Sequence, residues 1–157
     1  MTLRKKQGYK HYVRNTVPTL FSFGHGLSYT TFDITDLVVS NPSGLEMSFV
    51  ARVRVQNTGG RPGSEVVQIY VTPCSESKAT HPVRSLRGYG RTHELAPGES
   101  VNVEVKLDKL ALSYWNAPHN SWRLEKGQYT VIVGRCADDV LLSQDIEVTK
   151  EQYWNGL

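Results

Sequence analysis

Apolar and polar residues alternate with a period of two over most of the chain from Phe32 onward. The clearest run, over 101–107, sets four apolar residues against three polar ones: Val101, Val103, Val105 and Leu107 against Asn102, Glu104 and Lys106. A similar run covers 49–56, and 66–71 is apolar on both sides apart from Gln68. Successive side chains of a strand point to opposite faces, so these patterns predict half-buried strands around a central strand that is buried on both faces.

About seven strands are predicted, near 32–40, 49–56, 66–71, 85–95, 100–107, 128–135 and 140–148. No long helical pattern separates them, so hairpins or arches are expected to connect them. Asp108 is a candidate cap for one short helical turn over 108–112. The pattern predicts an all-β fold, an antiparallel sandwich of the immunoglobulin or fibronectin type III kind, over residues 32–157.

Residues 1–31 do not follow this pattern. We expect them to form an extended N-terminal arm that packs on another surface. They contain three tyrosines, two phenylalanines and the segment Gly24-His25-Gly26. Residues 1–32 hold five basic residues and no acidic one, so the remaining 13 basic and 15 acidic residues carry −2 of the net charge of +3. No basic residues interleave with aromatic ones in the way that base stacking requires, so we predict no nucleic-acid partner.

The composition is that of a soluble globular domain, with 39% hydrophobic and 21% charged residues. The apolar runs are only a few residues long, which predicts no membrane span. No apolar segment follows the basic N-terminus, so a cytoplasmic location is expected. Cys74 and Cys136 are expected to be free thiols, and because neither has zinc-ligand spacing, we predict no metal and no cofactor.

Several segments, in order along the chain, carry a family resemblance. They include Leu20-Phe21-Ser22-Phe23-Gly24-His25-Gly26-Leu27, Gly63-Ser64-Glu65-Val66-Val67-Gln68-Ile69-Tyr70-Val71, His81-Pro82-Val83-Arg84-Ser85-Leu86-Arg87-Gly88-Tyr89, Leu112-Ser113-Tyr114-Trp115 and Gly127-Gln128-Tyr129-Thr130-Val131. From about Gly8 to the last residue, the chain resembles the C-terminal fibronectin type III-like domain of glycoside hydrolase family 3 β-glucosidases, and its ending is similar to fungal members. In that family the catalytic carboxylates belong to other, upstream domains. The resemblance therefore implies a non-catalytic module standing alone, without glycosidase activity.

Five residues are candidates for a site outside that role. His25, His81 and His93 are candidate acid/base or anion-binding groups, since histidine titrates near neutral pH, and the glycines beside His25 allow a small-molecule pocket. Packed or exposed structural histidines are the alternative interpretation. Trp115 and Trp122 are candidates for stacking on sugars, and the alternative is that they fill the end of the sandwich.

Three function classes follow from these observations. The first is a non-catalytic accessory module of a β-glucosidase. The second is a stand-alone domain recruited to act on a small molecule, such as a polyketide cyclase or isomerase in fungal secondary metabolism, so the sequence leaves open whether the chain is an enzyme. The third is a carbohydrate-binding module. We also expect a homodimer, because the aromatic residues of the arm would otherwise be exposed.

Overall fold

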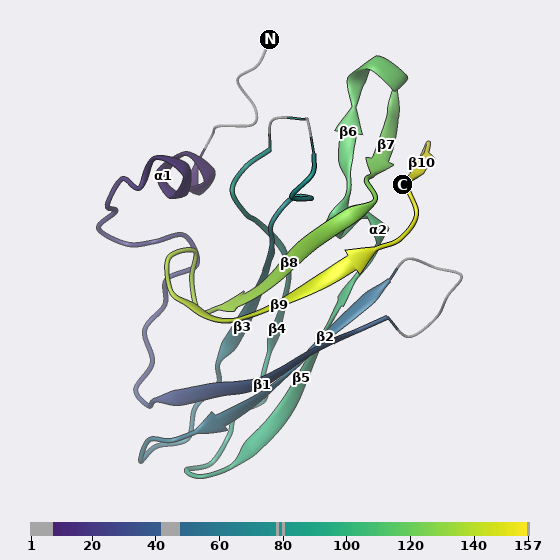
Figure 1. Ribbon diagram of the computed structural model, residues 1–157. Coiled ribbons are helices and arrows are strands. Elements are labelled where there is room, and N and C mark those ends of the chain that lie inside the picture. The colour runs from purple at the N-terminus through teal and green to yellow at the C-terminus, as the bar shows by residue number, and fades with distance from the viewer. Residues whose placement is uncertain (1–7, 42–47, 78, 80, 157) are drawn as a thin grey trace.

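Two antiparallel sheets pack face to face and form the body of the molecule (Figure 1). The computed structural model describes residues 8–41, 48–77, 79 and 81–156. One sheet has the order β1-β2-β5 and contains β1 (Phe32–Ser40), β2 (Phe49–Asn57) and β5 (Ser100–Leu107). The other has the order β4-β3-β8-β9 and contains β3 (Val66–Val71), β4 (Ser85–Arg91), β8 (Gly127–Gly134) and β9 (Val140–Val148). The predicted all-β sandwich of the fibronectin type III-like kind is confirmed.

The core lies between the two sheets and follows the period-two pattern. Val53 and Val103 are register partners on β2 and β5, and both are buried. They belong to the same hydrophobic cluster as Ile69 of β3 and Val131 of β8. Burying each such side chain stabilises the fold by roughly 1.5–3 kcal/mol, so the inward-facing residues of the alternating pattern hold the two sheets together.

The two open sides of the sandwich are closed by different means. Where β4 meets β5, Gly88 and Gly90 lie directly against valine side chains, and a Cβ at either glycine would stand 2.5 Å from one of them. On the other side, the side-chain amide of Gln144 in β9 accepts a hydrogen bond from Val39 N (2.9 Å) and donates one to Val39 O (3.2 Å). Exposed strand edges are prone to pairing with other chains, and here one glutamine side chain caps part of the β1 edge.

The arm covers part of the outer face of the four-stranded sheet, and it is not extended throughout as expected, because Tyr9–Asn15 form the helix α1. The Tyr9 ring stacks on Phe23 at 4.4 Å between centroids, and its hydroxyl accepts a hydrogen bond from Leu86 N at 2.8 Å. Tyr9 also meets the ring of Tyr70, which β3 presents on its outer face. This cover explains why β3 is buried on both faces. The basic residues Arg4, Lys5 and Lys6 lie outside the described residues.

A third, small sheet extends from one end of the sandwich and was not predicted. It contains β6 (Tyr114–Asn116), β7 (Ser121–Leu124) and β10 (Gln152–Trp154) in the order β10-β7-β6, and the 3-10 turn η2 (Ala117–His119) joins β6 to β7. The predicted helical turn is present as α2 (Lys109–Leu112), where the Asp108 carboxylate accepts a hydrogen bond from Ala111 N at 2.9 Å. Across the described residues, no helix has the length and apolarity that crossing a membrane would need.

Candidate functional site

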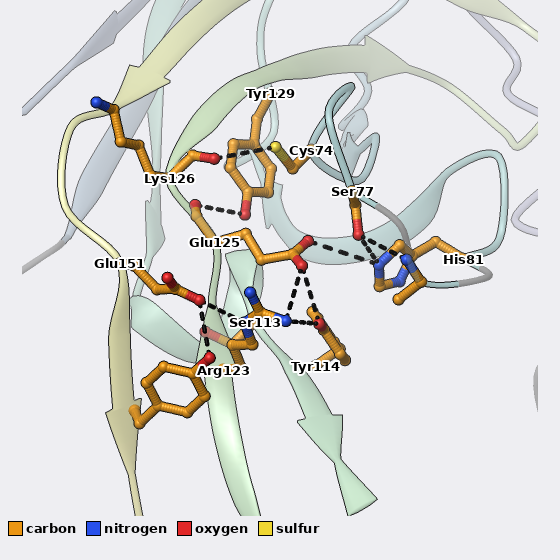
Figure 2. A network of polar contacts seen from close by, with 12 residues as sticks. Cys74, Ser77, His81, Ser113, Tyr114, Arg123, Glu125, Lys126, Tyr129 and Glu151 are labelled. Atoms are coloured by element: carbon orange, nitrogen blue, oxygen red, sulfur yellow. Dashed lines mark hydrogen bonds and ion pairs between the residues drawn. The ribbon is translucent and has the colours of Figure 1, made fainter. Parts of the chain in front are cut away.

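A network of polar side chains lies where the small sheet meets the end of the sandwich (Figure 2). At its centre is Glu125, the residue that follows β7. It is 8% exposed, and no other carboxylate in the part of the chain that the structure describes is buried. A buried ionised carboxylate is costly unless charged or hydrogen-bonding groups surround it, so this position marks the strongest candidate site.

Two neighbouring strands supply the groups that surround Glu125. Tyr114 of β6 and Arg123 of β7 are register partners, so their side chains share one face of the small sheet. The Tyr114 hydroxyl donates to Glu125 Oε1 at 3.0 Å, and Arg123 Nη1 lies 3.3 Å from the same oxygen. Arg123 also donates through Nε to Glu151 Oε1 at 2.5 Å. One cation therefore links a buried and an exposed carboxylate.

Burial and these contacts determine the protonation of the surrounding groups. Burial raises the pKa of the Tyr114 phenol, and its hydrogen bond to Glu125 raises it further. Burial also raises the pKa of Tyr129, whose hydroxyl donates to Glu125 O at 3.0 Å. For Arg123, burial is the largest single influence and lowers the pKa, but the hydrogen bond to Glu151 and the interactions with Tyr114 and Glu125 together outweigh it, so the net direction is upward. At neutral pH the phenols are therefore neutral donors and Arg123 is a cation.

Ser77, His81 and Glu125 resemble a nucleophile, a base and an acid, but their geometry is unsuited to that chemistry. Ser77 Oγ lies 2.8 Å from His81 Nε2, and Glu125 Oε2 lies 3.9 Å from the same nitrogen. In a catalytic triad the acid holds the other ring nitrogen and leaves Nε2 to the nucleophile. The arrangement instead ties the loop that carries His81 to the small sheet.

The space beside the network is small or open. A partly open cavity of about 30 Å³ is lined by Cys74, His81, Tyr114, Glu125 and Tyr129, among others. That volume holds a water or two, whereas small-molecule sites occupy roughly 300–1,000 Å³. A hollow of about 290 Å³ on the solvent side is lined by charged side chains, and its Arg123 and Glu151 are already paired with each other. The network therefore serves as a structural polar cluster.

The three candidate histidines are not brought together. His25 lies on the arm with its ring 5.3 Å from that of Phe21, and His93 lies in an exposed turn with Nε2 3.3 Å from Glu99 Oε1. Only His81 reaches the network. An open hollow of about 350 Å³ is lined by Gly24 and Gly26, as their sequence position suggested, but His25 is not among the residues that line it.

The central residues of the network, Glu125, Tyr114 and Arg123, were not singled out from the sequence. The available signal was local: a glutamate and an arginine flank Leu124, two residues apart, in a short segment rich in aromatic residues. Nothing local distinguishes this pair from two solvated surface charges. The two cysteines, Cys74 and Cys136, are both free and buried, which confirms the expectation of free thiols.

Trp115 and Trp122 face each other on β6 and β7 as register partners, with ring centroids 5.7 Å apart and ring planes at 79°. Trp115 is 45% exposed, so the alternative expectation that both tryptophans fill the end of the sandwich is wrong for this residue. The ring that packs against the edge of the core is that of Trp154, the third tryptophan, on β10.

Comparisons with known proteins agree with this fold. A family model described as a fibronectin type III-like domain matches residues 65–137. A β-glucosidase from Kluyveromyces marxianus is 43% identical over 155 residues, which is 96% of this chain and 17% of that enzyme. A probable β-glucosidase I from Emericella nidulans is 41% identical over 156 residues, which is 96% of this chain and 18% of that protein. The chain thus spans less than a fifth of the length of these curated relatives.

Solved structures give the same result. The structure of β-glucosidase 3B from Thermotoga neapolitana in complex with α-D-glucose matches with a TM-score of 0.87 at 34% identity, over 96% of this chain and 20% of that one. The crystal structure of the Kluyveromyces marxianus β-glucosidase matches with a TM-score of 0.86 at 38% identity, over 97% of this chain and 18% of that one. The predicted resemblance is confirmed: residues 65–137 form a fibronectin type III-like domain, and almost the whole chain is similar to one segment of β-glucosidases of glycoside hydrolase family 3.

Proposed function

We propose that this chain is a non-catalytic accessory module that packs through its N-terminal arm against the carbohydrate-active domains of a family 3 β-glucosidase. The observation that carries the proposal is the outward face of the arm. Of the 13 large hydrophobic residues that are exposed in the described part of the chain, seven lie within residues 8–31. They are Tyr12, Val17, Leu20, Phe21, Phe23, Leu27 and Tyr29.

These side chains form a surface of the kind that binds another protein. Tyr12, Leu20, Phe21 and Phe23 line one open groove of about 550 Å³ between α1 and the segment that follows it. Leu20 is 91% exposed. Contiguous apolar patches above a few hundred Å² are uncommon on soluble monomers and mark interaction sites. The arm is fixed to the sandwich by the hydrogen bond from Leu86 N to the Tyr9 hydroxyl and by that from Ala137 N to the Phe23 carbonyl, so the outer face is held in a defined position.

The absence of glycosidase activity is the second part of the proposal. Retaining glycoside hydrolysis uses two carboxyl groups about 5–5.5 Å apart that face one sugar. Among the described residues the one buried carboxylate, Glu125, is engaged by Tyr114 and Arg123 beside a cavity of about 30 Å³. The same small volume gives no support to a recruited small-molecule enzyme.

A chimera tests the docking role. The matching 155-residue segment of the Kluyveromyces marxianus β-glucosidase is replaced by this chain, and the thermal unfolding midpoint is compared between variants of the chimera and of the isolated chain. Phe21→Ser should lower the midpoint of the chimera by several degrees. It should leave the midpoint of the isolated chain nearly unchanged at a protein concentration low enough for that chain to be monomeric, because Phe21 is 68% exposed in the single chain. Leu20→Ser should behave in the same way.

Val38→Ser is the matched control, since Val38 is also apolar and 56% exposed but lies on β1, away from the arm. It should leave both midpoints unchanged. If Phe21→Ser and Val38→Ser had the same effect on the chimera, or if neither had any, the arm would not be the docking surface.

A further inference from the structure

The small sheet has two chemically different faces, and one of them carries all three tryptophans of the chain. Trp115 pairs with Trp122, and Trp122 pairs with Trp154, so the three side chains form one row across β6, β7 and β10. Directly opposed residues of antiparallel strands share a face. The opposite face carries the row Tyr114, Arg123 and Tyr153, which includes the polar network.

The row runs from a covered end to an exposed end. Trp154 packs against the hydrophobic core, and the Lys109 ammonium lies 5.0 Å from the centre of its ring. Trp122 is partly buried in the middle of the row. Trp115, on the edge strand β6, is 45% exposed. Since the rings of Trp115 and Trp122 stand at 79° to each other, the exposed end forms a corner of two indoles rather than a flat strip.

We propose that this indole corner, Trp115 with Trp122, binds a β-linked glucosyl unit of a soluble oligosaccharide by stacking. A β-glucopyranose ring has its hydroxyl groups equatorial, so both of its faces present C–H groups. C–H groups carry a small positive charge and pack well on the electron-rich face of an aromatic ring. A corner accommodates one or two sugar rings, whereas lying flat on a crystalline glucan surface requires coplanar aromatic rings.

The size of the surface favours a sugar over a protein partner. The exposed part of Trp115 amounts to roughly 110 Å² if a full indole side chain offers about 250 Å². A stable protein interface needs about 800 Å² on each partner. The arm offers a surface large enough for a protein partner, and it lies apart from the small sheet (Figure 1). The exposed residues Asn120, in the turn before β7, and Lys109, beside Trp154, flank the row and offer hydrogen bonds to sugar hydroxyls.

This inference is independent of the docking role of the arm, and the test is made on the purified chain. The chain is labelled with ¹⁵N and titrated with cellotetraose while the three indole N–H signals are followed, and the dissociation constant is measured by calorimetry. The signals of Trp115 and Trp122 should shift, and that of Trp154 should not. Trp115→Ala should weaken binding by about tenfold or more, and Trp115→Phe should recover part of the loss.

Tyr153→Ala is the matched control, because Tyr153 is 47% exposed on the opposite face of the same sheet. It should change the dissociation constant by less than about twofold. A β-1,4-linked mannotetraose, whose axial hydroxyl group at C2 interrupts one face of each ring, should bind more weakly than cellotetraose. Thermal unfolding of each variant establishes that it is folded.

Three outcomes would overturn the proposal. The first is that cellotetraose shifts no indole signal of the wild-type chain. The second is that Tyr153→Ala weakens binding as much as a folded Trp115→Ala variant does. The third is that the Trp115 signal shifts with protein concentration and not with sugar, which would make the indole corner a protein contact.

Discussion

Replacing Gly90 with alanine would place a methyl group inside the contact between β4 and β5. The new Cβ would lie 2.5 Å from Val103 Cγ1 and 3.3 Å from Val105 Cγ2. Valine has few alternative side-chain rotamers, so neither neighbour moves away easily. Overpacking of this kind costs about 1–3 kcal/mol of the free energy of unfolding. The backbone of Gly90 has no positive φ, so the cost measures packing rather than backbone strain.

The reverse change, Val103→Ala, should also destabilise the fold. Val103 is buried in the core as predicted from its inward position in the alternation. Removing its two methyl groups costs roughly 1.6 kcal/mol of transfer free energy and leaves a cavity, so a loss of about 1–3 kcal/mol is expected. Glu104→Ala, one residue further, removes only an exposed ion pair with Arg52. It should lower the free energy of unfolding by less than about 1 kcal/mol.

The double variant is the decisive measurement, because the two changes compensate each other. Val103→Ala removes the methyl group that the new Cβ of residue 90 would strike, and that Cβ fills part of the cavity. The combined loss should therefore be smaller than the sum of the single losses by about 1–2 kcal/mol. Urea unfolding followed by circular dichroism gives these free energies, provided that the m-values agree. Additive losses, or equal losses for Val103→Ala and Glu104→Ala, would refute this packing of β4 on β5.

Three further predictions concern activity, assembly and pH. The purified chain should not hydrolyse aryl β-glucosides or cellobiose, and turnover that follows the protein through purification above a mock preparation would contradict this. Sedimentation equilibrium should give about twice the 17.6 kDa monomer mass, and a Leu20→Ser, Phe21→Ser double variant should be monomeric; a wild-type monomer at every concentration would exclude the homodimer. Burial raises the pKa of Tyr70 and Tyr129 above the usual value near 10. The unfolded phenols therefore release protons first, and the free energy of unfolding should fall as the pH rises above about 10. Urea midpoints measured across that range test this, and Tyr129→Phe should reduce the dependence.

The strands could be predicted from the sequence wherever a local pattern of residues repeats several times. The alternation of inward Val103 with outward Glu104 predicted both β5 and its buried face. A strand of eight residues repeats the two-residue period often enough to be recognised. Asp108 marked the start of α2, since the cap bond to Ala111 N joins residues only three apart. The ordered motifs over almost the whole chain were enough to identify the family.

The small sheet could not be predicted, because its strands are three or four residues long and show at most two periods of the alternation. Its third strand is distant in sequence as well, since Trp154 pairs with Trp122. The register of that sheet alone determines that three tryptophans form one row. It also places Tyr114 beside Arg123, which makes the burial of Glu125 possible.

The arm shows the same division between local and tertiary information. Its aromatic residues were visible in the sequence, but the outer face of the four-stranded sheet decides which of them are partly buried. Tyr9 is held by Tyr70 and Leu86 N, whereas Phe21 remains 68% exposed. A helix of seven residues is marginal in water by itself, so α1 owes its stability to this docking. The sequence alone thus determined the strands of the two main sheets and the family that they resemble. Only the tertiary structure decided which polar and aromatic side chains meet, because those contacts join residues that are far apart along the chain.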